Sequence, residues 1–212
     1  MPFFDCHIDL KLSDRDRESI DPVALHYLPN DAPEGFAPCK IVGDGNCFPR
    51  SLSYICFRSE DMDVEFRVRL QYEALLNAKN YLNNKYISRG CNIVYRRGGP
   101  CKQIAMYSEC YNPAEELDVV KIYKKEVLSL SKNGTYCGLW QLAQAANILC
   151  RPVMSVYPTD LHEGMRLEFN RTFFCFDNKY NDREPVVIMW TPMQVSKNSY
   201  PIHFVPLLKA VS

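Results

Sequence analysis

The apolar positions of the chain follow helical spacing up to residue 149 and strand-like patterns after it. A repeat near 3.6 residues marks one face of a helix, whereas alternation or a short unbroken apolar run marks a strand. We therefore expect two sets of elements. The helices are 48–57, 61–83, 112–131 and 139–149, with a single turn at 22–27. The strands are 93–95, 153–157, 166–176, 185–190 and 200–208. Helices followed by a late cluster of strands predict a mixed α/β fold of the α+β class.

Two of these helices rest on specific signals. In 61–83, apolar residues recur at near-helical spacing and are expected to form its core face: Val64, Val68, Tyr72, Leu75 and Leu82. In 112–131, Asn112 is a good N-cap and Pro113 suits the first turn, so we expect this helix to begin there.

The first 36 residues differ from the rest of the chain. They are polar and interrupted by prolines, as in Pro29 to Gly35, which is typical of turns and irregular segments. The remaining residues, 37–212, are long enough for one domain with a substantial core. We expect an N-terminal arm over 1–36 and a single domain over 37–212.

Charge and cysteine content exclude several classes. The chain has 25 Lys plus Arg and 25 Asp plus Glu, so no basic excess points to nucleic acid. Its ten cysteines include no Cys-x-x-Cys pair, which argues against a zinc finger or ribbon. No apolar run has signal-peptide or membrane-spanning length. We expect an intracellular protein, cytoplasmic or nuclear, that has reduced cysteines and no membrane association.

Residues 43–50, Gly-Asp-Gly-Asn-Cys-Phe-Pro-Arg, combine loop and helix signals around one thiol. Cys47 lies where a glycine-containing loop turns into a helix, and a helix N-terminus favours the thiolate. Gly43 and Gly45 allow a loop whose backbone N–H groups face an anionic intermediate. The alternative is a cysteine that is simply buried after a turn.

A histidine near the C-terminus favours the catalytic interpretation. His203 lies in the apolar run 201–208, where an imidazole is costly unless it has a polar partner. A cysteine at a helix start and a histidine on a late strand are typical of cysteine hydrolases. The other histidines, at 7, 26 and 162, fall in the arm or in a loop and are expected at the surface. Cys137 is the best alternative nucleophile, although no glycine loop precedes it.

These residues resemble the ovarian-tumour (OTU) family of cysteine deubiquitinases. The resemblance lies in Asp44 to Cys47, in Arg50, in His203-Phe204, and in the helix and strand over 138–157. It implies a papain-like fold of the OTU type, with helices packed around a small central β-sheet. It also implies a monomeric thiol protease that hydrolyses isopeptide bonds at the C-terminus of ubiquitin or polyubiquitin. Such a protease requires no metal and no other cofactor.

The resemblance assigns roles to individual residues. Cys47 is the nucleophile, His203 is its ion-pair partner and general acid, and the Gly45-Asn46 loop forms the oxyanion hole. The family often has Asn or Asp two residues after the histidine, but this chain has Val205. We therefore expect Asp44 to orient His203, with Asn198 or an acidic residue of the arm as alternatives.

The departure at Val205 motivates two other functions. The first is an inactive OTU-fold module that binds ubiquitin, and the second is a protease for another ubiquitin-like modifier or a viral polyprotein.

Overall fold

A single mixed β-sheet forms the centre of the protein. The computed structural model describes residues 8–13, 16, 18–91, 98–159, 161, 163–196 and 199–210. Within them the strands follow the order β1-β5-β4-β2-β3. Only β2 and β4 are parallel, and the other pairs are antiparallel. The strands are β1 (Phe36–Pro38), β2 (Val153–Val156), β3 (Arg171–Phe173), β4 (Val186–Thr191) and β5 (His203–Lys209).

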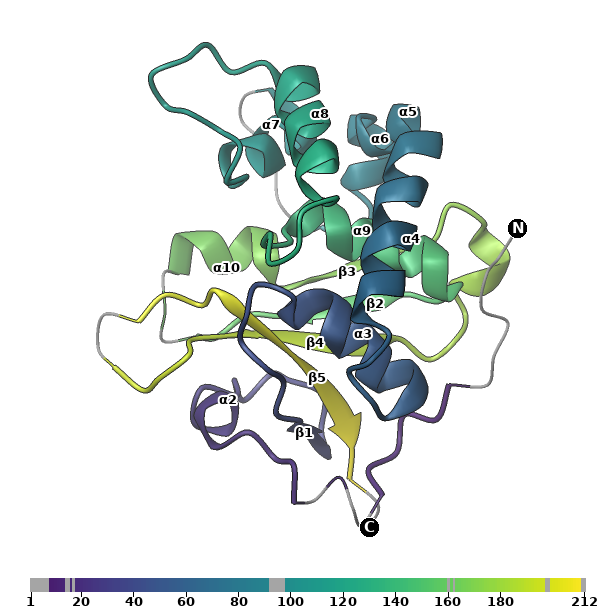
Figure 1. Ribbon diagram of the computed structural model, residues 1–212, viewed down its shortest axis with the longest axis vertical. Helices are drawn as coiled ribbons and strands as arrows, with labels where there is room; N and C mark the ends of the chain where they lie inside the picture. Colours follow the sequence, from purple (N-terminus) through teal and green to yellow (C-terminus); the bar gives the residue numbers. More distant parts are fainter. Residues whose placement is uncertain are drawn as a thin grey trace.

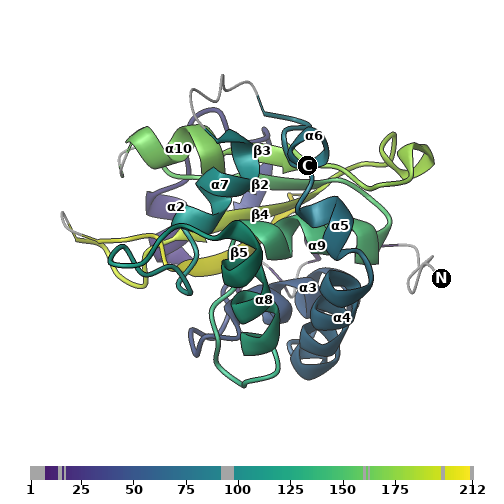
Figure 2. The same cartoon turned by 90° about the horizontal axis from the view of Figure 1, so that it is seen from above.

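Helices cover the sheet on both sides. Figure 1 shows α4 to α9 above the sheet and α2 below it, beside the edge strand β1. From above, α3, α4 and α8 lie on one side of the strands, and α6 and α10 lie on the other (Figure 2). The α+β fold is thereby confirmed. The helices are α2 (Pro22–His26), α3 (Cys47–Phe57), α4 (Asp63–Leu76), α5 (Ala78–Tyr81), α6 (Asn84–Ile87), α7 (Gly99–Met106), α8 (Val119–Ser129), α9 (Leu139–Leu149) and α10 (Glu163–Phe169), with the short 3-10 helix η1 (Asn178–Tyr180).

The core lies where α3, α4 and α9 pack together and against the strands. Every residue of α9 except Asn147 is buried, and the whole of β4 is buried. Helix α3 packs on β5 through Phe48 and Phe204, whose ring centroids are 5.0 Å apart in a T-shaped contact. This contact brings the start of α3 beside the start of β5, the two places where Cys47 and His203 lie.

The N-terminal segment packs into the same core. Leu12 N–H donates to Lys209 O at 2.7 Å, and Lys209 N–H donates to Leu10 O at 2.8 Å. Both leucines are buried, as is Ile8. The predicted turn at 22–27 is confirmed as α2, capped by the Asp21 carboxylate. The division of the chain at residue 36 stays a prediction. The residues described on both sides of it contribute to one hydrophobic core.

The predicted helix 61–83 is wrong in its length and in its buried face. Helix α4 ends at Leu76, and the non-helical Asn77 separates it from α5. The residues expected in the core face outward: Val64, Val68, Tyr72 and Leu75 are 64%, 56%, 53% and 60% exposed. The buried face carries Phe66, Arg67, Leu70 and Ala74 instead. Both sets are spaced as helical stripes, so periodicity alone could not choose between them.

The helix predicted over 112–131 begins seven residues late. Asp118 is its N-cap, and its carboxylate accepts the Lys121 N–H at 2.9 Å. The Asn112 side chain caps a local turn instead, by accepting the Ala114 N–H at 3.1 Å. Asparagine stabilises turns and helix starts by the same kind of hydrogen bond, which explains the error.

The predicted strand 166–176 is largely wrong. Its first part is helix α10, and only Arg171–Phe173 forms a strand, β3. Leu167, one of the apolar residues of this segment, lies on α10 and is exposed. Helix 139–149 and the strands near 153–157, 185–190 and 200–208 are confirmed with small shifts at their ends. The strand expected at 93–95 lies outside the described residues.

Candidate functional site

The loop before Cys47 is held in a conformation that requires glycine at position 45. Gly45 has φ of +81°, in the left-handed region that other residues rarely adopt. A Cβ on Gly45 would lie 2.0 Å from the carbonyl oxygen of Gly134. Two glycine-containing loops, far apart in the sequence, therefore touch through their backbones beside the start of α3.

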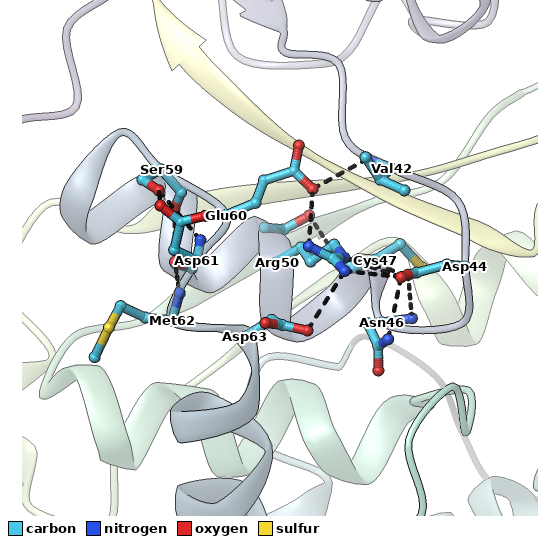
Figure 3. A network of polar contacts seen from close by, with 12 residues as sticks. Val42, Asp44, Asn46, Cys47, Arg50, Ser59, Glu60, Asp61, Met62 and Asp63 are labelled. Atoms are coloured by element: carbon cyan, nitrogen blue, oxygen red, sulfur yellow. Dashed lines mark hydrogen bonds and ion pairs between the residues drawn. The ribbon is translucent and has the colours of Figure 1, made fainter.

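Asp44 belongs to an ion-pair network on the outer side of this loop (Figure 3). Its carboxylate accepts from Arg50 Nη2 at 2.8 Å and from Arg50 Nε at 3.2 Å. It also accepts the Asn46 backbone N–H at 2.9 Å. The Arg50 guanidinium is the main reason why the pKa of Asp44 is lowered to about 2. Asp44 thus remains charged and fixes the loop.

Asn46 joins this loop to two other segments. It is buried, and its Oδ1 accepts from Arg67 Nη2 at 2.7 Å and from Gly134 N–H at 3.1 Å. Its Nδ2 donates to Asn133 Oδ1 at 2.9 Å. Arg67 Nη2 also lies 3.2 Å from Gly45 O and 3.0 Å from Thr135 O. One buried guanidinium on α4 therefore organises both loops.

Cys47 is the first residue of α3 and is only 2% exposed. Burial is the largest influence on its thiol and raises the pKa to about 11, although hydrogen bonding to the backbone of Phe204 and Phe48 opposes this. Burial therefore opposes the thiolate that a helix N-terminus favours.

Ser51 ties the first turn of α3 to β5. Its hydroxyl lies 2.7 Å from the Cys47 carbonyl oxygen and 3.2 Å from the Phe204 carbonyl oxygen. The Phe204 backbone also lies in hydrogen-bonding reach of the Cys47 thiol. The structure thus brings the predicted nucleophile beside the strand that begins with His203.

His203 is 4% exposed and pairs with Thr191 across the β4-β5 ladder, as expected for a strand next to 185–190. Its ring lies near the loop that precedes Cys47, because a Cβ on Gly43 would be 3.6 Å from His203 Cε1. Burial lowers the pKa of His203. Within the described part of the chain, no hydrogen bond joins the Cys47 thiol to this ring.

The surroundings of His203 favour the alternative of an acidic residue of the arm over Asp44. Burial lowers the pKa of His203, and this is opposed by the charge of Asp21, by the Ile41 backbone, which lies in hydrogen-bonding reach of the ring, and least by Asp44. Asp21, the cap of α2, is the acidic residue of the arm in this environment. Val205 lies in the core, and Asn198 is outside the described residues.

A cavity of about 320 Å³ lies next to these loops. Its wall includes residues 135–139, which follow the Gly134 loop, and Pro201 and Ile202, which precede His203. Cys137, the alternative nucleophile, is part of this wall, and burial raises the pKa of its thiol further than that of Cys47. It is a poorer candidate than Cys47. Among the described residues, no group of three or more His, Cys, Asp or Glu side chains could hold a metal ion.

Arg67, Ser51 and Asn133 contribute to the site but were not predicted from the sequence. Arg67 is part of the buried stripe of α4, where a charged residue among apolar ones is a recognisable signal. Ser51 and Asn133 carry no such signal, because their roles depend on contacts across 153 and 87 residues of sequence. His26 is exposed, as expected, whereas residues 7 and 162 are outside the described part.

Comparisons with known proteins agree on one family. The family described as "Vertnin, OTU domain" matches residues 38–191. Vertnin of Danio rerio is 26% identical over 202 residues, which is 91% of this chain and 28% of that protein. Human Vertnin is 25% identical over 145 residues, which is 66% of this chain and 19% of that protein. The chain therefore spans less than a third of these relatives.

Solved OTU domains are also similar, at lower identity. The OTU domain of OTUD1 aligns with a TM-score of 0.47 and 13% identity, covering 92% of both chains. The viral OTU protease of Dera Ghazi Khan virus aligns with a TM-score of 0.45 and 14% identity, covering 82% of this chain and 81% of its own. The match to the family model over residues 38–191, rather than these structural alignments, assigns the chain to its family.

No helix of the described residues is long and apolar enough to cross a membrane.

Proposed function

The chain belongs to the Vertnin OTU-domain family, and we propose that it is a thiol-dependent hydrolase that cleaves isopeptide bonds at the C-terminus of ubiquitin. One observation carries the proposal. Cys47 begins a helix that Ser51 and the Phe204 backbone hold against the strand bearing His203. This juxtaposition is what nucleophilic catalysis by a cysteine and a histidine requires.

The directions of the two pKa shifts favour a general-base mechanism over a preformed ion pair. Burial raises the pKa of Cys47 to about 11 and lowers that of His203. We propose that His203 takes the thiol proton as Cys47 Sγ attacks the carbonyl carbon of the substrate. The imidazolium then protonates the leaving lysine amine, which leaves a thioester on Cys47. Water, deprotonated by His203, releases ubiquitin and restores the thiol.

The loop that precedes Cys47 would stabilise the oxyanion. The Asn46 N–H already donates to Asp44, so we assign the hole to the backbone N–H groups of Cys47 and Gly45. Asn46 then has a positioning role, because its side chain holds the loop against residues 133–135. Asp44 and Arg50 fix the outer side of the same loop.

We propose that Ile41 and Asp21 take the place of the residue that the family carries two positions after the histidine. The Ile41 backbone orients the ring, and the negative charge of Asp21 stabilises the imidazolium that forms during turnover. The proposed activity places the protein inside the cell, where ubiquitin conjugates are found.

A second candidate function is ubiquitin binding without turnover. It is favoured by the burial of the neutral Cys47 thiol, which limits access by a substrate carbonyl. Hydrolysis at the C-terminus of another ubiquitin-like modifier is a variant of the first proposal. The chemistry is the same, and the acyl group that Cys47 receives belongs to a different modifier.

The test uses ubiquitin that carries a C-terminal electrophile. Wild-type protein should form a covalent adduct, and Cys47→Ala should abolish it. Cys56→Ala, on the same helix, and Cys137→Ala, in the cavity wall, are matched controls that should retain the adduct. An adduct that survives Cys47→Ala would refute the site.

Turnover separates the two candidates. Cleavage of diubiquitin over many cycles, lost in His203→Ala, supports the hydrolase. Ubiquitin binding by wild-type protein, with neither an adduct nor cleavage, supports the binding module. Reaction with another modifier's probe and none with ubiquitin would reassign the substrate.

A further inference from the structure

The loop that contacts Asn46 contains a pair of residues prone to a spontaneous chemical change. Asn133 is followed by Gly134, and no other asparagine of the chain precedes a glycine. In such a pair the backbone nitrogen of the glycine can attack the side-chain amide of the asparagine, because glycine has no Cβ to hinder the approach. Asn133 is also exposed, so water reaches the site of this reaction.

The two residues form the centre of a tight turn. Thr135 N–H donates to Lys132 O at 3.4 Å, and Gly134 has φ of +77°, which favours glycine at the second central position. A Cβ on Gly134 would meet the Asp44 carbonyl oxygen at 3.3 Å, and no side chain of the described residues beyond the turn lies within 4 Å of it. Side chains therefore do not crowd Gly134.

The Asn46 side chain holds both reacting groups of this pair. Its Oδ1 accepts the Gly134 N–H at 3.1 Å, and its Nδ2 donates to Asn133 Oδ1 at 2.9 Å. Asn46 is only 2% exposed, and its Oδ1 also accepts from Arg67 Nη2 at 2.7 Å, which fixes the amide. The attack needs a backbone nitrogen that has lost its proton, whereas an N–H that donates to a buried acceptor retains it. Asn46 thus protects the turn.

We propose that Asn133 is a modification site, at which deamidation proceeds when the turn separates from Asn46. In the separated turn, hydroxide or a buffer base removes the Gly134 amide proton, and this nitrogen attacks Cγ of Asn133. The bond between Cγ and Nδ2 breaks, ammonia leaves, and a cyclic succinimide joins the two residues. Water then opens the ring at either of its carbonyl carbons. The product is aspartate or isoaspartate, and no oxidant or reductant is consumed.

The isoaspartate product alters the contact between the two loops of the site. It inserts the side-chain methylene into the main chain before Gly134, whose carbonyl oxygen lies 2.0 Å from the place of a Cβ on Gly45. Contacts this close leave no room for a longer chain, so the turn moves away from the loop before Cys47. The aspartate product keeps the main chain and an acceptor for Asn46 Nδ2. The inference does not rest on the proposed activity.

Incubation at mildly alkaline pH, followed by mass spectrometry of the peptide that carries position 133, tests the proposal. Asn46→Ala removes both hydrogen bonds to the turn and should raise the deamidation rate at least about tenfold. Asn147→Ala is the matched control, because it removes several hydrogen bonds far from the turn and should leave the rate unchanged. The exposed Asn112 should stay unmodified, because Pro113 has no N–H. Thermal melting verifies that each variant is folded.

A synthetic peptide of residues 129–137 gives the unprotected rate and decides the question even where Asn46→Ala does not fold. The folded wild-type protein should deamidate at least about tenfold more slowly than the peptide. Equal rates in the protein and the peptide would overturn the protection by Asn46, as would equal acceleration by Asn147→Ala. A peptide that is not deamidated would overturn the site itself.

Melting of the products tests the consequence for the loops. Asn133→Asp should melt at the wild-type temperature, whereas the isolated isoaspartate form should melt at a lower one. Equal melting temperatures for the two forms would overturn the displacement of the turn.

Discussion

Replacing Arg67 by methionine should loosen both loops of the site. Arg67 Nη2 lies within hydrogen-bonding distance of Asn46 Oδ1, Thr135 O and Gly45 O. Methionine fills a similar volume but has no donor. Because one Nη2 group has two hydrogens, two of these bonds are well formed at any time.

The magnitude follows from two opposing contributions. Two hydrogen bonds from a charged donor contribute about 3–6 kcal/mol before any offset. Against this, methionine removes a buried guanidinium whose Nη1 has no hydrogen-bond partner, which recovers several kcal/mol of desolvation. Asn46 Oδ1 also keeps the Gly134 N–H. We expect a net loss of about 2 kcal/mol, which lowers the urea midpoint by about 1 M.

The rate at which Cys47 reacts should fall by more than the loss of folding stability explains. Without Arg67, the Gly45 loop is free to move relative to Cys47, and a displacement of about 1 Å can slow a reaction roughly 100-fold. We expect labelling of folded protein by the ubiquitin electrophile to slow by about 10- to 100-fold, and Arg67→Lys to give an intermediate rate.

Arg69→Met is the matched control, because Arg69 lies on the same helix and forms an i,i+4 pair with Glu65. It should cost less than about 1 kcal/mol. If Arg67→Met unfolds at the wild-type midpoint and labels at the wild-type rate, the assigned role of Arg67 is wrong.

Three other substitutions examine the neighbouring contacts. The pKa of Asp44 is depressed to about 2 beside Arg50, so its carboxylate stabilises the fold above pH 4, and this contribution is lost as the pH falls towards 2. Asp44→Asn should cost roughly 1 kcal/mol at pH 7, after allowing for solvent screening, and the difference from wild type should vanish near pH 2 in denaturation experiments. Asp21→Asn keeps a good helix cap but removes the charge that raises the pKa of His203. That pKa should fall in an NMR titration, and an unchanged value would exclude the assigned role of Asp21. Ser51→Ala should lower the free energy of unfolding by about 1–2 kcal/mol in urea titrations, since two buried carbonyls lose their shared donor; no loss would show that this link is unimportant.

Local sequence patterns predicted a helix or strand correctly where no second pattern competed with the first. The α9 helix and the strand β4 were predicted well, because α9 carries one clear apolar stripe at helical spacing and β4 is a continuous apolar run. The helix start at Cys47 also followed from its own loop. Helix α4 was predicted in kind but not in orientation, because its two stripes have similar periodicity and only the packing partners decide which one is buried.

The sequence by itself determined which residues are candidates for the site and their order along the chain. A glycine loop, a cysteine at a helix start and a histidine in a late apolar run are local features that need no knowledge of long-range contacts. Only the tertiary structure decided which contacts hold the site residues in place and in which direction their pKa values shift. Burial raises the pKa of Cys47 and lowers that of His203, Arg67 and Ser51 connect distant segments, and Asp44 bonds to Arg50 rather than to the imidazole. Desolvation and hydrogen-bond choice depend on what the completed fold places around each group, and no local pattern contains that information.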